Sequence, residues 1–424
     1  RIRPYLKYPN RRSCVKIAKS MQNLPQELQL QSTYEDWQNK KFSNPKATIR
    51  VATLFSGIGA IEHALKRLKL KSEIVFACDN DAFVKESYLA NYQIDDKHFY
   101  DDVSESSLNA KKYKHKVDLL VGGSPCQSFS MIGERKGLED TRGTLFYDFA
   151  RVISECRPKV FIFENVKGLL SHDEGQTWEI IQKVFQELNY DFSSQVLNSK
   201  HFGVPQNRNR VFVVGFRQSN KQFRFPARIN LETKMQDYLE DYVDSKFYLK
   251  DKGMKFVTGL KNQVKSYTQI NGEVALCQKA NQQFNWHGDF IFEKALEKLK
   301  YDEQLFEINE IAEKYYLSEK VEKYVRLEGT KTFKTRAETD LEIARPLLQS
   351  MHKMHRAGVD NYVTHSGRIR KLTPRECLRL MGFRDDFKIV VSDTQVYRQA
   401  GNSIVVDVLI ALLKQMDITQ FSKR

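Results

Sequence analysis

The stretch Leu54-Phe55-Ser56-Gly57-Ile58-Gly59-Ala60 decides the fold, because it reads as a strand that ends in a glycine-rich turn. The apolar run Ile49–Phe55 predicts the strand, and a helix is expected from about Ile61. Glycines at such a turn let the backbone approach a ligand closely, and an acid about twenty residues further on can bind a ribose. Asp79 lies at that distance. The spacing differs from Gly-x-Gly-x-x-Gly, which argues against a dinucleotide.

Residues 47–217 continue the alternation of strand and helix that this turn begins. Further β-rich runs are Glu73–Cys78, Val117–Val121, Val160–Phe163 and Val211–Phe216. Between the last two, Thr177–Leu188 has apolar residues at helical spacing. Strands separated by helices predict βαβ units, so we expect an α/β fold with a mainly parallel sheet.

The rest of the chain divides into three parts. Residues 1–46 are polar and basic, and we expect them to form an N-terminal extension. Residues 218–368 are charged and uneven, with amide and aromatic clusters, which favours a smaller, irregular domain. The α/β pattern returns in residues 369–424, which close on the apolar helix Ile404–Leu413. We therefore expect residues 47–217 and 369–424 to form one domain.

Composition limits the partners and the compartment. Lys and Arg outnumber Asp and Glu by 68 to 53, a net charge of +15. Such an excess favours a polyanion, because phosphate contacts release counterions, although an ordinary basic protein has the same charge. The six cysteines form no Cys-x-x-Cys pair, so we expect no metal site and a reducing compartment. We also expect neither a signal peptide nor a membrane-spanning run.

Reactive or polar groups follow several predicted strands. One strand leads into Gly122-Gly123-Ser124-Pro125-Cys126, and another leads into Glu164-Asn165-Val166. In an open parallel sheet, ligands bind beyond the carboxyl ends of the strands. We therefore expect the glycine turn, Asp79, Cys126 and Glu164 to gather at one edge. A lone cysteine is usually a buried small hydrophobe, but four such groups at four strand ends indicate a functional site.

With these motifs in this order, the chain resembles the DNA cytosine-5 methyltransferases, especially the bacterial restriction-modification and orphan enzymes. The motifs that match are Phe55–Gly59, Pro125-Cys126-Gln127 to Ser130, Arg142-Gly143-Thr144-Leu145-Phe146, Glu164-Asn165-Val166, Gln206-Asn207-Arg208-Asn209-Arg210, Leu372–Cys377, Leu380–Phe383 and Gly401-Asn402-Ser403. The resemblance implies a Rossmann-like methyltransferase domain that uses S-adenosyl-L-methionine to methylate cytosine within a specific short sequence of double-stranded DNA. Residues 218–368 would then be the target recognition domain.

The resemblance also implies the catalytic roles. Cys126 would attack C6 of cytosine, because C5 becomes a good nucleophile only after a thiolate has added at C6. Glu164 would hold the base at N3 and at the exocyclic amine, and a proton at N3 would withdraw electron density from the ring. Asn165 would orient the loop that carries Cys126. Arg208 and Arg210 would steady the cytosine O2, this loop and a nearby phosphate, with Arg210 preferred for the base.

Attack at C6 along the π-face requires the cytosine to leave the base stack, so the enzyme would flip the base out. The loop from Ser130 to Arg142 would close over it. An ordinary solvated turn has the same sequence character.

The implied cofactor pocket uses residues from both ends of the chain. Asp79 would bind the ribose hydroxyls, Asp102 the adenine amine, and Val103 would lie against the adenine ring. The other pocket residues are Phe55, Ser56, Gly57, Ile58, Gly59, Asn80, Pro125, Leu145, Asn402 and Ser403. Four positions depart from the family pattern. Ser56 and Ala60 stand where Ala or Gly, and Gly, are frequent, and both are small enough to be tolerated. Asp79 stands where Glu is commoner, and Asn80 stands where an apolar or aromatic residue is frequent, which puts adenine stacking there in doubt.

Two alternatives stay open. One branch of the family methylates tRNA, although the long segment 218–368 favours sequence-specific DNA. The other alternative is a catalytically inactive DNA-binding regulator, against which the intact Cys126, Glu164 and Arg210 count. The resemblance further implies a monomer without a membrane partner in the bacterial cytoplasm. A cognate restriction endonuclease of the same system is a compatible partner.

Overall fold

The computed structural model describes residues 37–125, 145–217, 223–240, 341–344, 346–347 and 368–422, with short strands at 268–270, 287–290, 357–360 and 362–365. Cys126 and the predicted closing loop therefore lie outside the described residues, as do residues 1–36 and most of the segment 218–368.

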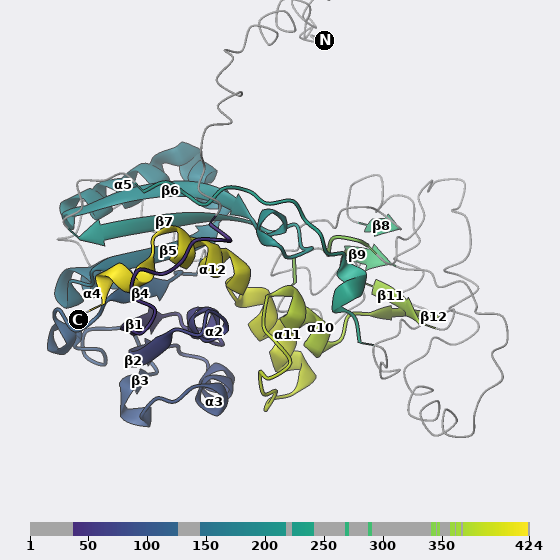
Figure 1. Ribbon diagram of the computed structural model, residues 1–424, viewed down its shortest axis with the longest axis horizontal. Coiled ribbons are helices and arrows are strands. Elements are labelled where there is room, and N and C mark those ends of the chain that lie inside the picture. The colour runs from purple at the N-terminus through teal and green to yellow at the C-terminus, as the bar shows by residue number, and fades with distance from the viewer. Residues whose placement is uncertain are drawn as a thin grey trace, which may run out of the picture.

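A seven-stranded sheet forms the centre of the molecule, with the strand order β3-β2-β1-β4-β5-β7-β6 (Figure 1). The strands are β1 (Thr48–Leu54), β2 (Lys71–Cys78), β3 (Phe99–Tyr100), β4 (Leu119–Gly122), β5 (Val160–Val166), β6 (Tyr190–Asn198) and β7 (Asn209–Arg217). All pairs from β3 to β5 are parallel, and β7 runs antiparallel to both β5 and β6. The predicted α/β fold with a mainly parallel sheet is confirmed.

Helices cover both faces of this sheet (Figure 1). They are α2 (Ala60–Arg67), α3 (Ala82–Asn91), α4 (Leu145–Cys156), α5 (Gln176–Glu187), α10 (Pro374–Leu380), α11 (Asp393–Asn402) and α12 (Val406–Gln415). Because side chains alternate along a strand, Ile49 and Val51 of β1 join the core under α2 and α12, whereas Ala52 and Leu54 join the core under α4 and α5. In Figure 1 the yellow α12 lies by the purple N-terminal elements, and it contacts α2.

Short 3₁₀ segments lie between or after these elements, and the longest of them, Lys167–Gly175, is kinked. They are η2 (Asp96–His98), η3 (Ala110–Tyr113), η5 (Lys167–Gly175), η6 (Ser199–Phe202), η7 (Met235–Tyr238) and η10 (Ile418–Phe421). The described end of the N-terminal segment packs on the domain, since Trp37 is buried and its Nε1 donates to the carbonyl of Ala227 at 2.9 Å.

Two small sheets lie apart from the central one, on the right in Figure 1. The first contains β8 (Thr268–Ile270), β9 (His287–Phe290) and β10 (Ala357–Asp360). The second is the antiparallel pair β11 (Tyr362–His365) and β12 (Arg368–Lys371). Both fall within or at the end of the segment for which the sequence predicts a separate domain.

Within the described residues, one stretch is long and apolar enough to cross a membrane, Asp393–Gln415. It consists of α11 and α12, which Ser403 and the two residues after it separate. Because 67% of its apolar window is buried inside the protein, we interpret it as a pair of core helices.

Candidate active site

The carboxyl ends of four neighbouring strands meet at one edge of the sheet. Leu54 at the end of β1 pairs with Cys78 of β2 and with Gly122 of β4, and Gly122 pairs with Phe163 of β5. This register brings together the glycine turn, Asp79, the segment that leads to Cys126, and Glu164. Cys126 lies outside the described residues, whereas Pro125 directly before it is described and exposed.

The glycine turn after β1 has a left-handed backbone at three positions. Phe55, Gly57 and Gly59 have φ angles of 52°, 54° and 76°. A Cβ at position 59 would lie 2.2 Å from the ring of Tyr92, whose hydroxyl donates to the carbonyl of Gly59 at 2.8 Å. A Cβ at Gly57 would meet no atom within 4 Å, so the backbone there faces open space. This turn therefore leaves room for a ligand.

Asp79, at the end of β2, is bound to this turn. The amide of Gly57 donates to its Oδ2 at 2.9 Å, and the amide of Asp81 donates to its Oδ1 at 3.1 Å. Burial raises the pKa of Asp79 above its usual range, although these amides act against the shift. Each carboxylate oxygen retains a second lone pair, which suits a ribose hydroxyl. The next residue, Asn80, is exposed.

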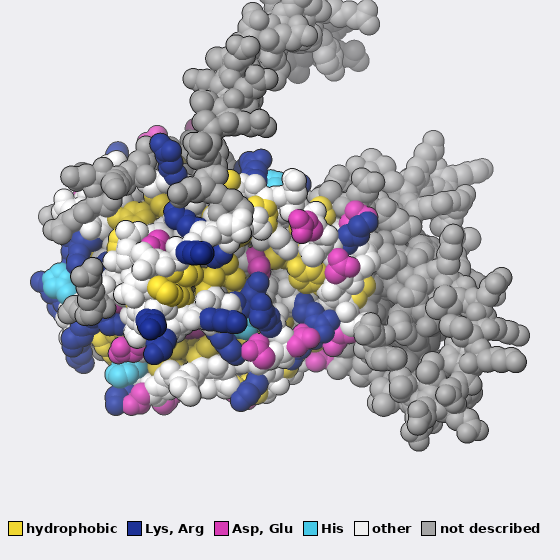
Figure 2. Space-filling view, viewed as in Figure 1, with side chains coloured by type: hydrophobic (Ala, Val, Ile, Leu, Met, Phe, Trp, Pro, Cys, Tyr) yellow, Lys and Arg dark blue, Asp and Glu magenta, His cyan; other side chains and the backbone are white. Residues whose placement is uncertain are grey.

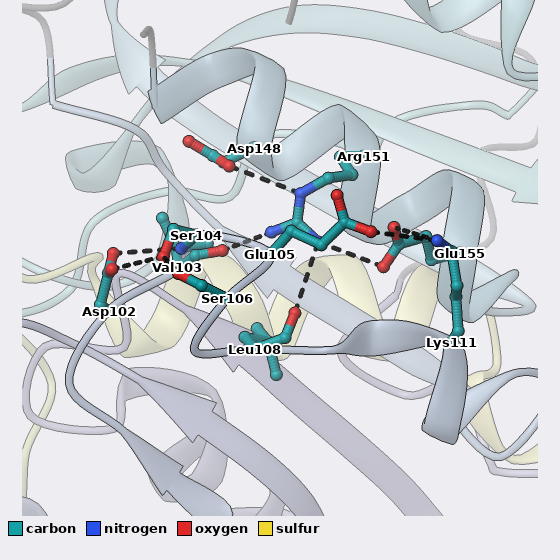
Figure 3. A network of polar contacts seen from close by, with 10 residues as sticks. All are labelled: Asp102, Val103, Ser104, Glu105, Ser106, Leu108, Lys111, Asp148, Arg151 and Glu155. Atoms are coloured by element: carbon teal, nitrogen blue, oxygen red, sulfur yellow. Dashed lines mark hydrogen bonds and ion pairs between the residues drawn. The ribbon is translucent and has the colours of Figure 1, made fainter. Parts of the chain in front are cut away.

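Asp102 and Val103 follow β3 in a loop that α4 holds in place (Figure 3). Ser104 donates to Asp102 through its amide and its hydroxyl, and the hydroxyl bond is the main cause that lowers the pKa of Asp102. Val103 is buried, and its carbonyl accepts a hydrogen bond from Arg151 of α4. Asp102 is thus an exposed, ionised acceptor beside a buried apolar side chain.

Arg151 is a residue of this site that the sequence analysis missed. Besides Val103, its guanidinium donates to the carbonyl of Leu108 at 3.4 Å and to Glu155 at 3.1 Å, and Asp148 lies 3.5 Å away (Figure 3). These bonds fix the loop after Asp102 to α4. The spacing of Asp148, Arg151 and Glu155, which places them on one helix face, is the sequence feature that could have identified Arg151.

Glu164 lies in β5 beside the segment that leads to Cys126. Its side chain is 12% exposed, and Nε of Arg210 lies 3.1 Å from its Oε1. Burial raises the pKa of Glu164, whereas Arg210 and Arg208 lower it, and burial is the larger effect. A Cβ at Gly123 would lie 2.6 Å from the carbonyl oxygen of Glu164 and 3.1 Å from its Oε2. The glycine is therefore required for this close approach.

Asn165 ties the same segment to β5. Its Nδ2 donates to the carbonyl of Ser124 at 2.8 Å, and its Oδ1 accepts from the amide of Val166 at 2.9 Å. The side chain is 3% exposed. The backbone two residues before Cys126 is therefore anchored through a buried amide.

Arg208 contacts backbone from two distant parts of the chain. Its Nη2 donates to the carbonyls of Gly401 and Ser403 at 3.0 Å each, and its Nη1 donates to Leu347 at 3.4 Å. Arg208 therefore supports the turn between α11 and α12, while Arg210 lies against Glu164. In that turn Asn402 is exposed and Ser403 is buried. Leu145, the first residue of α4, packs against the core on the other face of the sheet.

Gln206 joins three segments of the chain, a role that sequence reasoning did not identify. Its buried Nε2 donates to the carbonyl of Leu380 at 2.7 Å, and its Oε1 accepts from the amide of Leu347 at 3.1 Å. The backbone beside it pairs with Ala344. Gln206 therefore fixes to the catalytic domain both the last part of residues 218–368 and the helix α10 that follows it.

Glu62 on α2 is a buried carboxyl behind the glycine turn. The hydroxyl of Tyr88 donates to its Oε1 at 2.6 Å, and Oε2 is buried without a hydrogen-bond partner. Burial raises the pKa of Glu62 to about 7.

The raised pKa of Glu62 makes stability depend on pH. Its contribution is complete below the unfolded pKa and is lost as pH rises through about 7. Between pH 5 and pH 8, we expect the wild type to lose about 2–3 kcal/mol of unfolding free energy relative to Glu62→Gln. Urea denaturation at both pH values measures this difference, with the exposed Glu105→Gln as control. Parallel pH profiles for wild type and Glu62→Gln would contradict the assignment.

Comparison with known proteins identifies the family. Residues 49–417 match the model of the C-5 cytosine-specific DNA methylases. The orphan methyltransferase M.SPRI of Bacillus phage SPR is 32% identical, with 88% of this chain and 99% of that protein covered. The type II methyltransferase M.SsoII of Shigella sonnei is also 32% identical, over 88% of this chain and 81% of its own length.

Solved structures show the same fold. A DNMT2 mutant of Spodoptera frugiperda has a TM-score of 0.58 at 20% identity and covers 87% of this chain and 99% of its own. A putative DNA modification methyltransferase from an E. coli prophage has a TM-score of 0.52 at 21% identity, with 87% and 98% covered. The family match extends over most of the sequence, so the chain belongs to the C-5 cytosine-specific DNA methylases and is a DNA methyltransferase that acts on C5 of cytosine.

Proposed function

We propose that this chain methylates a flipped-out cytosine within a specific short sequence of double-stranded DNA, using S-adenosyl-L-methionine and covalent addition of Cys126 to C6. The observation that carries the proposal is the buried pair of Glu164 and Arg210, packed against the segment that leads to Cys126. A carboxyl group beside a guanidinium can bind one edge of cytosine, with the carboxyl at N3 and the exocyclic amine and the guanidinium at O2.

The residues at the glycine turn fit S-adenosyl-L-methionine. The open space at Gly57 suits the methionine part of the cofactor. The carboxylate of Asp79 suits the ribose, and the exposed carboxylate of Asp102 suits the adenine amine. When bound, this cofactor supplies an electrophilic methyl group. Val103, Leu145 and Asn402 complete the pocket in the proposal.

Cys126 and Glu164 divide the chemistry between them. The thiolate of Cys126 forms a bond to C6, and the electron pair of the C5–C6 double bond moves to C4–C5. The C4–N3 π pair moves onto N3, which takes the proton of Glu164, so C5 becomes the nucleophilic carbon of an enamine. The raised pKa of Glu164 favours the protonated form that this step needs. C5 would then bond to the methyl group as the S–CH3 bond of the sulfonium breaks, which would leave a neutral thioether. Transfer of the C5 proton to water, return of the N3 proton to Glu164 and expulsion of the Cys126 thiolate restore the aromatic ring.

The base must leave the duplex for this attack, because stacking blocks the π-face of C6. In the proposal, Arg210 holds the O2 of the flipped cytosine, Asn165 orients the loop of Cys126, and Arg208 acts indirectly through the turn at Ser403. The loop from Ser130 to Arg142, outside the described residues, closes over the base.

Residues 218–368 choose the DNA sequence in this proposal, while residues 47–217 and 369–424 perform the chemistry. The small sheets of β8–β12 support this division, because their described strands form sheets separate from the central one. Exchanging this segment for that of a relative with another target should transfer the sequence preference. An active chimera that still methylates the original sequence would contradict the division.

A methyl-transfer assay tests the proposed substrate. Radiolabelled S-adenosyl-L-methionine is incubated with the full chain and duplex DNA, single-stranded DNA or tRNA. We expect label in duplex DNA, and bisulfite sequencing should find it at one position of a recurring short motif. Label in tRNA alone would establish the RNA alternative instead.

Arg151→Ala should weaken the binding of S-adenosyl-L-methionine about tenfold or more, because it removes bonds from a charged group to the loop beside Asp102. The rate at saturating cofactor should change little, since Arg151 lies away from the cytosine site. Calorimetry measures the affinity. Arg157→Ala, which removes a bond to Leu188, is the matched control. Equal affinities for Arg151→Ala and this control would refute the role.

A further inference from the structure

A cavity of about 250 Å³ lies beyond the ends of β6 and β7, outside the site of Glu164. Its polar lining consists of Lys167, Gln195, Asn198, His201, Asn209 and Arg228, and none of the described lining residues is acidic. Figure 2 shows acidic and basic side chains mixed over the visible described surface. The described lining of this pocket therefore contains only cations and neutral groups, as does that of the adjoining hollow that shares Gln195 and Arg228.

The cavity adjoins the candidate active site but does not share its residues. Val166 pairs with Arg210, and Lys167 is the next residue after Val166. Asn209 is next to Arg210 and pairs with Asn198. Because neighbouring residues of a strand point to opposite faces, Asn209 points away from Arg210. A ligand in the cavity would therefore lie beside the cytosine site without occupying it.

The basic groups of the cavity have no counter-charge among the described residues. Lys167 and Arg228 are exposed, and neither they nor His201 forms an ion pair there. By contrast, Arg50, Arg67 and Arg379 each pair with an aspartate at 2.7–2.8 Å. Positive groups that converge without a carboxylate repel one another, and an anion relieves this repulsion.

The pKa of His201 reflects the same excess of positive charge. Burial lowers its pKa first, and Arg228 and Lys200 lower it further. With Lys167 in the cavity lining, the charged groups near this imidazole in the described structure are all basic. A bound anion would stabilise the imidazolium, so binding would be accompanied by proton uptake.

We propose that this cavity binds a phosphate of the DNA backbone next to the cytosine that is methylated. Lys167 and Arg228 would make charge-assisted hydrogen bonds to the phosphate oxygens, and the amide of Asn209 would add a neutral one. Such a contact fixes the duplex in position and carries no sequence information. The inference rests on the proposed function, because it takes duplex DNA as the substrate.

The test is the salt dependence of DNA binding by Lys167→Ala/Arg228→Ala. Fluorescence anisotropy gives the affinity for two duplexes, one with and one without the methylated motif, between about 50 and 200 mM salt. We expect the slope of log affinity against log salt to fall by about one for each cation removed. Both duplexes should lose affinity alike. Lys167→Arg should retain the wild-type slope.

A matched control separates a local contact from net charge. Lys71→Ala/Lys116→Ala removes two exposed lysines at the opposite, amino-terminal edge of the sheet. Lys71 is the first residue of β2, and Lys116 precedes β4. Its slope should stay near that of the wild type. If both double variants have the same slope and affinity, the phosphate site does not exist, even where the wild type methylates DNA normally. A wild type that does not methylate DNA refutes the proposed function itself.

The proton uptake gives an independent measurement. The wild type should bind DNA more tightly at pH 6 than at pH 8 by a larger factor than His201→Gln does, at constant salt. The difference between the two proteins isolates His201 from the other titrating groups. Identical pH dependence of the two would overturn the placement of a phosphate beside His201.

Discussion

Cys126→Ala should lower the rate of methyl transfer by about 10⁴-fold or more, because no other group can activate C5 once the nucleophile is lost. Duplex binding should stay within a few-fold of the wild type, since the thiol adds little contact area. Single-turnover transfer of radiolabelled methyl measures the rate, and anisotropy measures the binding.

The control for Cys126 is another cysteine of the same domain. Cys156 is buried in α4, and burial raises the pKa of its thiol to about 12, so it is protonated and unreactive at neutral pH. Cys156→Ala should transfer methyl groups at nearly the wild-type rate. A Cys126→Ala protein that retains wild-type activity would rule out covalent catalysis by Cys126.

Glu164→Gln should lower the rate of the chemical step by about 10²–10⁴-fold, because the amide cannot deliver a proton to N3. The variant has nearly the same shape, but it leaves Arg210 without its ion-pair partner. We expect the loss in the rate at saturating DNA and cofactor, with a smaller change in DNA affinity. Glu105→Gln, at an exposed ion pair with Lys111, is the control.

The pH profile separates proton delivery from a purely structural effect of Glu164. Because burial raises the pKa of Glu164, the wild-type rate should fall as pH rises and the carboxyl loses its proton. Glu164→Gln should lack this limb of the profile. A rate loss with an unchanged pH profile would mean that Glu164 only positions its neighbours.

The sequence predicts those elements whose apolar residues recur with a clear strand or helix period, together with the glycine turn. β1, its glycine turn and α5 were all expected within a few residues of where they lie. β6 was not predicted as a strand, because an edge strand has one open side and its centre, Asp191–Gln195, is partly or fully exposed. A half-solvated strand lacks the apolar pattern on which sequence reasoning depends.

The site was predictable where its residues follow strand ends, as Asp79 and Glu164 do. Contacts between distant segments were not. Arg210 meets Glu164 because β7 is inserted antiparallel between β5 and β6, an order that local patterns do not reveal. Gln206 and Arg151 also act through carbonyls far away in the sequence. Such roles depend on packing, so only the folded chain identifies them.

The most direct test of the covalent mechanism uses duplex DNA in which the target cytosine carries fluorine at C5. After addition of Cys126 and transfer of the methyl group, fluorine cannot leave as a proton does, so the enzyme should remain bonded to C6. Mass spectrometry of the digested complex should find methylated 5-fluorocytosine on the peptide that contains Cys126, and only when S-adenosyl-L-methionine is present. An active wild-type enzyme that forms no adduct, or an adduct on Cys377, would contradict the mechanism proposed for this site.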